Sequence, residues 1–204
     1  MKLLTRPIAL IKDSRRAYLA LNAATFGVFI VGLVVGTIWP RAARGANDLI
    51  EVLAGVSPAS DSVYSAVDGG RVWLLAAIIL VANIAFGGLL MAVLPSLLVP
   101  FAGIVIHITF AALLGLTYAP VDGWGLLLPH LPTLVIELSA YVLFMLGVYR
   151  LGTGVLVPRL RGFPSRAAGY RQGLVDIAWL CIPAVLLLVV GAVYEAFEVI
   201  ALLT

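Results

Sequence analysis

Long apolar stretches alternate with short polar ones along this chain, and the alternation predicts helices that cross a membrane. The apolar stretches cover residues 17–39, 72–94, 101–118, 134–151 and 174 to near the C-terminus. A transmembrane helix needs about 17–25 consecutive, mostly apolar residues. The sequence therefore predicts an all-α, polytopic bundle of five transmembrane helices, which forms one integral membrane domain over residues 1–204.

The first apolar stretch has to be distinguished from a signal peptide, because it also follows a basic tail. A secretory apolar region has about 7–15 residues, and the stretch 17–39 is longer. We therefore expect an uncleaved first helix. Its small residues Gly32 and Gly36 form a GxxxG pair, which promotes close contact between helices.

The second and third stretches are joined by a turn that carries no charge. Pro95 and Pro100 break the helix there, but no Lys or Arg anchors the turn in water. Two arrangements stay open for these stretches: two full spans, or a re-entrant hairpin. Non-helical backbone at membrane depth is tolerated only where protein or water covers it.

Lys and Arg decide the orientation, because they accumulate in short loops on the cytoplasmic side. The two predicted inner segments hold ten of them, and the predicted outer loop holds three: Lys2, Arg6, Lys12, Arg15, Arg16, Arg150, Arg159, Arg161, Arg166 and Arg171, against Arg41, Arg44 and Arg71. We expect a cytoplasmic basic tail (1–16), an outer loop (40–71), a cytoplasmic Arg-rich loop (150–173) and an outside C-terminus. Asp176 is then a solvated or capping group at the inner boundary.

Two polar segments have some helical character. The tail places apolar residues between its basic ones, so it is suited to lie on the inner surface. In the outer loop, residues 47–70 read partly as a short helix with an apolar side at Leu49, Ile50 and Val52, which Ser57 and Pro58 interrupt. A plain loop remains an alternative for this segment.

Composition excludes several classes of function. The chain is 63% hydrophobic and only 11% charged, whereas soluble domains carry about 25% charged residues. No basic face with interleaved aromatic residues indicates nucleic-acid binding. Cys181 is the only cysteine, and neither an HExxH motif nor a cysteine pair is present, so we expect no metal site and no cofactor. No motif indicates a hydrolase nucleophile, and we expect no enzymatic activity.

Polar residues inside the apolar stretches are the candidates for function. An ionisable group at the bilayer centre costs about 2.5–3.5 kcal/mol, so it usually faces the bundle interior or a partner. The candidates are Asn83, His107, His130, Glu137, Glu195 and Glu198. His130 lies in the loop before the fourth span and Glu137 lies seven residues further on, so the two can come together, and Glu195 or Glu198 can join them near the outer boundary. Three interpretations stay open for this cluster: hydrogen bonds that fix the helices, a transport or proton-relay pathway, and metal binding or catalysis.

Three segments resemble the stage II sporulation protein M family of bacteria and archaea. The first contains Leu128-Pro129-His130, Glu137-Leu138, Gly147 and Arg150-Leu151-Gly152; the second is Ala192-Val193-Tyr194-Glu195-Ala196-Phe197; the third is Ala82-Asn83-Ile84-Ala85-Phe86 with Gly87-Gly88. The sequence departs from the family pattern at Leu131, where the family has glycine. Three extra residues also separate His130 from Glu137. The resemblance covers about Val72 to the C-terminus.

The resemblance implies a five-helix protein of the cell membrane that acts through assembly. In spore-forming bacteria the family member is a membrane partner of peptidoglycan-degrading proteins. We therefore expect a non-enzymatic scaffold or subunit of an envelope complex. Its partners would be the lipid bilayer and either other membrane proteins or further copies of itself. The alternative is a permease or channel-like subunit that uses the His/Glu cluster.

Overall fold

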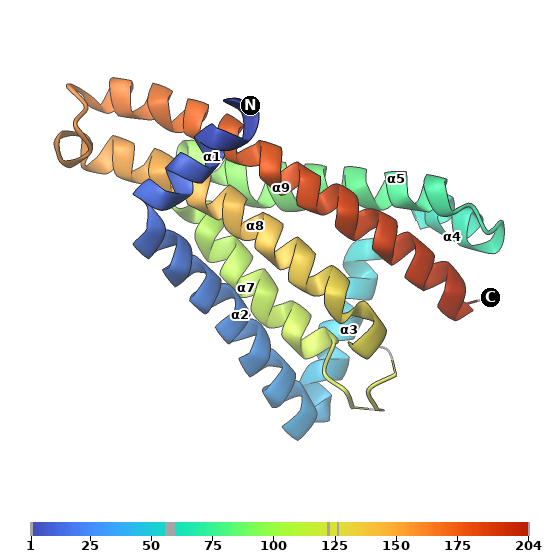
Figure 1. The fold of residues 1–204 in the computed structure, drawn as a ribbon. Helices are drawn as coiled ribbons and strands as arrows, with labels where there is room; N and C mark the ends of the chain where they lie inside the picture. The colour runs from blue at the N-terminus through green and yellow to red at the C-terminus, as the bar shows by residue number, and fades with distance from the viewer. Residues whose placement is uncertain (1, 56–59, 122, 126, 204) are drawn as a thin grey trace.

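Helices are the only regular secondary structure in the computed structural model, which describes residues 2–55, 60–121, 123–125 and 127–203 (Figure 1). In chain order they are α1 (Lys2–Asp13), α2 (Arg15–Ile38), α3 (Pro40–Gly55), α4 (Ser60–Asp68), α5 (Val72–Ala82), the π-helix η1 (Asn83–Val93), α6 (Leu94–Leu98), α7 (Ala102–Thr117), α8 (Leu127–Leu156), the 3₁₀-helix η2 (Pro158–Arg161) and α9 (Arg166–Leu203). The described residues contain no strand, so the all-α prediction is confirmed.

Four helical stretches are long and apolar enough to cross a membrane. They are α2, the continuous stretch 72–98 that includes α5, η1 and α6, then α8 and α9. They correspond to the first, second, fourth and fifth predicted spans. The third, α7, has 16 residues and is about 24 Å long at 1.5 Å per residue, against about 30 Å of hydrocarbon in a typical bilayer.

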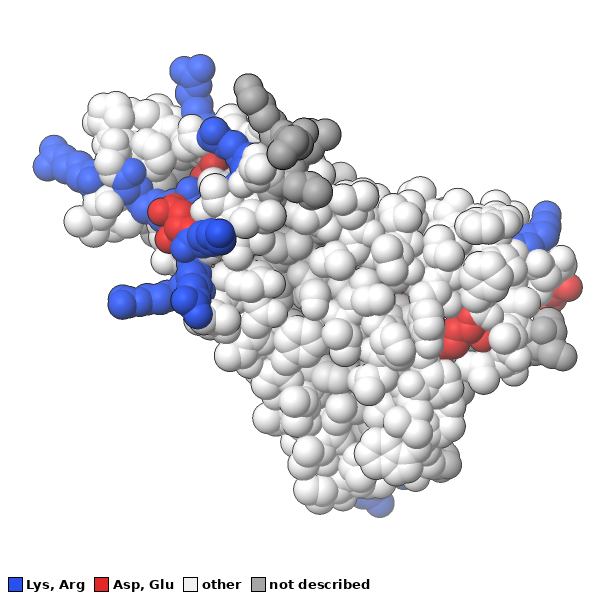
Figure 2. Space-filling model, viewed as in Figure 1, with Lys and Arg blue, Asp and Glu red and all other residues white. Residues whose placement is uncertain are grey.

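Most of the visible Lys and Arg side chains gather at one end of the molecule (Figure 2). Figure 2 shows Lys and Arg clustered around α1 and the connection between α8 and α9, with a broad uncharged belt beside them. We call this the basic end; it comprises α1, η2, the starts of α2 and α9, and the end of α8. The uncharged belt is what a helix bundle needs where it faces lipid.

The central helix is α8, which is covered by other helices on most of its surface. Phe144, Met145 and Leu146 are at most 2% exposed, and α9 packs along the length of α8. Small residues permit this contact. A Cβ atom on Gly154 would lie 2.8 Å from the carbonyl oxygen of Gly169 on α9.

The close-packing face predicted on the first helix is confirmed in the contact between α2 and α7. A Cβ atom on Gly32 would lie 3.0 Å from the Cα atom of Gly115 on α7, so the two backbones touch there. Gly36 is also buried on this face. Packing between backbones replaces the hydrophobic driving force that helices lack inside lipid.

The start of α8 differs from the prediction. We expected a loop up to residue 133 and a span from residue 134, but α8 begins at Leu127. Pro129 is its third residue, where the backbone N–H has no intrahelical partner in any case. Only Pro132 removes a helical hydrogen bond. His130 therefore lies on the helix rather than in a loop.

The stretch from Asn83 to Val93 is a π-helix, which the sequence pattern did not predict. π-Helical turns are rare and occur mostly as single turns, often at functional sites. Gly87 and Gly88 lie directly beneath the rings of Tyr141 and Phe144 of α8, so any larger side chain would collide with these rings. This contact keeps η1 and α8 close at the level of Asn83.

A tight turn joins α6 to α7. Ser96 is buried, and its hydroxyl accepts a 2.8 Å hydrogen bond from the backbone N–H of Gly103. Phe101 adopts a left-handed backbone conformation, with φ at 68°. The turn reverses the chain direction between η1 and α7, so both the two-span and the re-entrant arrangement remain compatible with it.

The N-terminal tail is a helix, α1, that packs on protein as well as presenting basic residues. It crosses α9, and its Leu10 is 8% exposed. Asp13, at the end of α1, accepts a 2.7 Å hydrogen bond from Nη1 of Arg150, which is 7% exposed. The tail is thus tied to the bundle by an ion pair.

Arg150 is the centre of a buried ionic cluster that we call the Arg150 cluster (Asp13, Ser14, Arg150, Gln172 and Asp176). Nε of Arg150 donates to Asp176 at 2.7 Å, and Nη1 donates to the Ser14 hydroxyl at 2.6 Å. Gln172 donates to the second oxygen of Asp176 at 2.9 Å. Asp176 is 2% exposed. Its prediction as a solvated or capping group was wrong, because its partner comes from another helix.

At the opposite end, the predicted outer loop is mostly helical. α3 begins at Pro40, directly after α2, and buries Ala43 and Ala46, while Leu49 and Val52 remain exposed. The break expected at 57–58 lies outside the described residues. α4 packs instead with α5 and the end of α9. In Figure 1 the α4–α5–α9 group diverges from α2 and α7 toward this end, and α3 lies between the two groups.

Candidate functional site

Four polar side chains follow one face of α8. His130, Thr133, Glu137 and Tyr141 are spaced by three, four and four residues, which places them one above another on an α-helix. The face is turned inward, since Thr133 is fully buried and Tyr141 is 3% exposed. The face extends for about 16 Å along the helix axis at 1.5 Å per residue.

At the deeper part of this face, Glu137 is joined to η1. The Asn83 side-chain amide donates a hydrogen bond to Oε1 of Glu137. The side-chain oxygen of Asn83 in turn accepts a 2.9 Å hydrogen bond from the Tyr141 hydroxyl. Both ends of the Asn83 amide are therefore used, and the three side chains connect η1 to α8.

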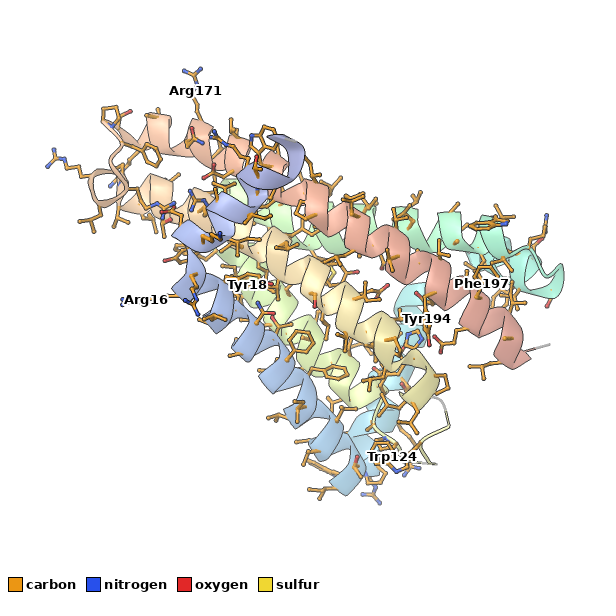
Figure 3. All side chains as sticks on the ribbon, viewed as in Figure 1. Arg16, Tyr18, Trp124, Arg171, Tyr194 and Phe197 are labelled. Carbon is orange, nitrogen blue, oxygen red and sulfur yellow. The ribbon has the colours of Figure 1, made fainter. Side chains whose placement is uncertain are left out.

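At the shallower part, His130 is joined to α9. Nδ1 of His130 lies 3.2 Å from each carboxylate oxygen of Glu198, and both side chains are nearly buried. The ring of Tyr118 stacks on the imidazole, with centroids 4.9 Å apart and planes 14° from parallel. Tyr194, labelled in Figure 3, donates to the carbonyl of Pro129 at 3.1 Å and joins the same two helices.

A cavity of about 760 Å³ opens beside His130 where the two helix groups diverge. Its walls come from α3, the end of α7, the segment that follows it, the start of α8 and the end of α9. The ionisable groups on its walls are Arg44, Tyr118, His130, Glu195 and Glu198. Glu195, one turn before Glu198, has no side-chain hydrogen bond to any described residue.

We call Asn83, Tyr118, His130, Glu137, Tyr141, Glu195 and Glu198 the polar network. Glu195 is close enough to Glu137 and to Glu198 for its negative charge to be repelled by each of theirs. Within the described part of the chain, the only salt bridge in the network joins His130 to Glu198. Closely spaced carboxyl groups away from water are stable together only when a proton or another cation offsets their charge.

His107 lies at the edge of the polar network. It is 2% exposed, its Nδ1 is 3.2 Å from the carbonyl oxygen of Gly103, and its ring packs against Tyr141 with centroids 5.0 Å apart. Nε2 of His107 has no hydrogen-bond partner among the described residues, and neither does the hydroxyl of the fully buried Thr133. Buried polar groups normally have a partner, and these two atoms are exceptions near the polar network.

The structure brings the candidate residues together, in part with the partners expected. Glu198 joins His130, as the sequence allowed, whereas Glu137 bonds to Asn83 rather than to His130. Among the described residues, no group of three His, Cys, Asp or Glu side chains is arranged to hold a metal ion.

Sequence reasoning missed three members of this site. Tyr141 and Thr133 each lie four residues from Glu137, so the helical spacing contained the signal that placed them on its face. Tyr118 is the last residue of the predicted third span, and nothing in the sequence indicates that it stacks on His130. The reason is that spacing defines a face within one helix and does not identify the helix opposite.

No protein-family model, curated protein or solved structure matches this chain. The functional argument therefore depends on the residues themselves.

Proposed function

We propose that this chain is a multi-pass protein of the cell membrane with five spans, its N-terminus and Arg-rich loop in the cytoplasm and its C-terminus outside. The concentration of ten Lys and Arg residues in segments 1–16 and 150–173 supports this orientation. α7 takes part as a short span beside α2, to which it is packed along its length. The cavity beside His130 then opens at the outer side.

Within this topology, the chain is a non-enzymatic scaffold or subunit of a membrane complex, similar to the stage II sporulation protein M family. One observation carries the proposal: the three segments of the resemblance meet in space. Asn83 bonds to Glu137, and Tyr194 bonds to the backbone of Pro129. Segments that form one structural unit are expected to contact one another, and these contacts join η1, α8 and α9.

The presented surfaces are α3 and α4 outside and the Arg-rich loop inside. Photo-crosslinking in native membranes tests this, with the photoreactive residue placed at Val52, Tyr64 or Leu160, which are 65%, 70% and 86% exposed. We expect discrete protein adducts from these sites. Ile30, 55% exposed on the apolar helix α2, is the matched control and should yield lipid adducts alone. Protein adducts from none of the three sites would contradict a role in assembly.

Cysteine labelling tests the topology separately, in a Cys181→Ser background. A membrane-impermeant reagent should label Ser62→Cys and Trp124→Cys from outside, and Leu160→Cys and Val99→Cys only from inside; Ser62, Trp124, Leu160 and Val99 are all exposed. The reverse pattern at Ser62 and Leu160 would overturn the orientation. Protection of Val99 from both sides would replace the two spans by a re-entrant hairpin.

A second function, as a permease or channel-like subunit, is favoured by Glu195. This carboxyl group faces the cavity, has no hydrogen bond to a described residue and lies near two other carboxyl groups. Such a group is suited to take up and release a proton or another cation. The face of α8 from His130 to Glu137 continues inward from the cavity.

Proton flux into liposomes that contain the purified protein tests this second function. Glu195→Gln should abolish the flux and leave the protein folded, because glutamine keeps the size of the side chain but does not titrate. Asp68→Asn removes an exposed acid from the same end and should leave the flux unchanged. If the wild-type protein conducts neither protons nor alkali cations, this function is wrong.

A further inference from the structure

A second cavity, of about 370 Å³, lies at the basic end. It is formed by the end of α1, the start of α2, Tyr149 of α8 and Arg161 of η2. Its charged lining residues are Lys12, Asp13, Arg15, Arg16 and Arg161. Four positive side chains and one negative one therefore surround a single hollow.

The one acidic group in this lining is already engaged. Asp13 accepts a 2.7 Å hydrogen bond from Arg150, and it lies 3.9 Å from Nη2 of Arg161. In the described part of the chain, Lys12, Arg15 and Arg16 form no salt bridge. The cavity consequently retains a net positive charge that the protein does not neutralise.

The start of α2 adds to this charge. α2 begins at Arg15, and the Ser14 side chain, which would normally cap it, is bonded to Arg150 instead. The first backbone N–H groups of a helix lack intrahelical partners and form its positive pole. Together with arginine side chains, they present the donors that a phosphate group takes up.

An apolar surface adjoins the cavity on α2. Leu19, one turn beyond Arg15 and Arg16, is 52% exposed, and the uncharged belt continues from there (Figure 2). We propose that the cavity at the basic end binds the phosphate group of an anionic lipid, whose acyl chains lie along α2. Basic pockets at the cytoplasmic ends of transmembrane helices are suited to such headgroups. The identification of the ligand as a lipid depends on the proposed topology, whereas the binding of a phosphate group does not.

Binding can be measured on the full-length protein, purified and delipidated in neutral detergent. Native mass spectrometry gives the apparent affinity for phosphatidylglycerol and for phosphatidylcholine, and calorimetry gives that for inorganic phosphate. We expect preference for phosphatidylglycerol. Arg16→Gln should weaken its binding about fivefold, and Arg15→Gln with Arg16→Gln about 25-fold, since each basic residue near an anionic surface contributes about a factor of five.

Arg171→Gln is the matched control, because it removes one exposed arginine of the basic end outside the cavity. Figure 3 shows Arg16 and Arg171 projecting in different directions from α2 and α9. Binding should be unchanged in this variant, and all variants should melt like the wild-type protein. Competition by inorganic phosphate would support a phosphate site that also takes the free anion, and lack of competition would support the lipid as its ligand. Equal losses in Arg16→Gln and Arg171→Gln, or no preference for phosphatidylglycerol, would overturn the proposal.

Discussion

The two ends of the molecule each bury ionisable groups, but they balance them differently. In the Arg150 cluster, one guanidinium lies between Asp13 and Asp176, and Gln172 and Ser14 take up further hydrogen bonds. In the polar network, His130 pairs with Glu198, Glu137 accepts a hydrogen bond from Asn83, and Glu195 has no hydrogen bond to a described residue. The charged groups of the Arg150 cluster all have partners within the protein, whereas Glu195 of the polar network has none among the described residues.

This difference separates a structural role from a functional one. A buried charge with a full set of partners fixes the geometry of the helices that carry it, and little remains for it to bind. A buried carboxyl group without a cation is stable only when something supplies the missing positive charge. The Arg150 cluster therefore attaches α1 to the bundle, and the polar network remains the proposed site of binding or assembly.

The largest effect is expected from Arg150→Met. The substitution leaves the buried carboxylate of Asp176 without its cation, and loss of one partner of a buried pair costs about 3–5 kcal/mol. Thermal unfolding in detergent measures this loss. Arg171→Met, which removes an exposed arginine of α9, should change the free energy of unfolding by less than about 0.5 kcal/mol.

A double variant makes the interpretation specific. Arg150→Met with Asp176→Leu removes both charges and should recover most of the stability, because a buried ion pair is often replaced by apolar residues without loss. A double variant as unstable as Arg150→Met alone would mean that packing of the arginine stem, and not the unpaired charge, causes the loss.

An intermediate effect is expected at Glu137. Glu137→Leu leaves the amide N–H of Asn83 without its acceptor, at a cost of about 1–3 kcal/mol, whereas Glu137→Gln keeps an acceptor and should change stability little. Thermal melting beside a complementation assay separates the two proposed functions. An active Gln variant with an unstable Leu variant supports the scaffold. A folded but inactive Gln variant supports proton or cation transfer instead.

The contrast between the two ends also shows which features of the fold and of the site could be predicted from the sequence. Hydropathy predicted the helices because a charge-free run of 20 residues has few alternatives in water or lipid. The cost of burying charge identified Glu137 as inward-facing, whereas the length of the fifth span placed Glu195 only at the outer boundary. The same argument failed for Asp176, since its position near a helix end is equally compatible with water. The π-helix at Asn83 and the start of α8 at Leu127 depend on contacts between helices, which a single sequence does not encode locally.

A smaller effect is expected from Thr133→Val. Thr133 lies between His130 and Glu137 on α8, and its buried hydroxyl has no partner among the described residues. If the polar network is completed by a bound cation or by water, loss of this hydroxyl should lower stability by about 1 kcal/mol. Thr25→Val is the control, because Thr25 is also buried without such a partner but lies on α2, which contributes nothing to the network. Equal behaviour of the two variants in thermal melting would contradict a special role for the α8 face.

The smallest effect is expected from Asp13→Asn, and it depends on pH. The hydrogen bond from Arg150 holds the pKa of Asp13 below its ordinary value of 3.8, with the charges of Arg150 and Arg161 acting in the same direction and partial burial opposing them. A carboxyl group whose pKa is lowered by folding stabilises the protein above its unfolded pKa, and this contribution is lost as the pH falls through the folded value. The wild-type protein should therefore melt slightly above the variant at pH 7 and together with it at acidic pH. Because the Asp13 side chain is 62% exposed, the difference at pH 7 should also shrink with added salt. A difference in melting temperature that is independent of both pH and salt would show that Asp13 contributes to the Arg150 cluster by its shape rather than by its charge.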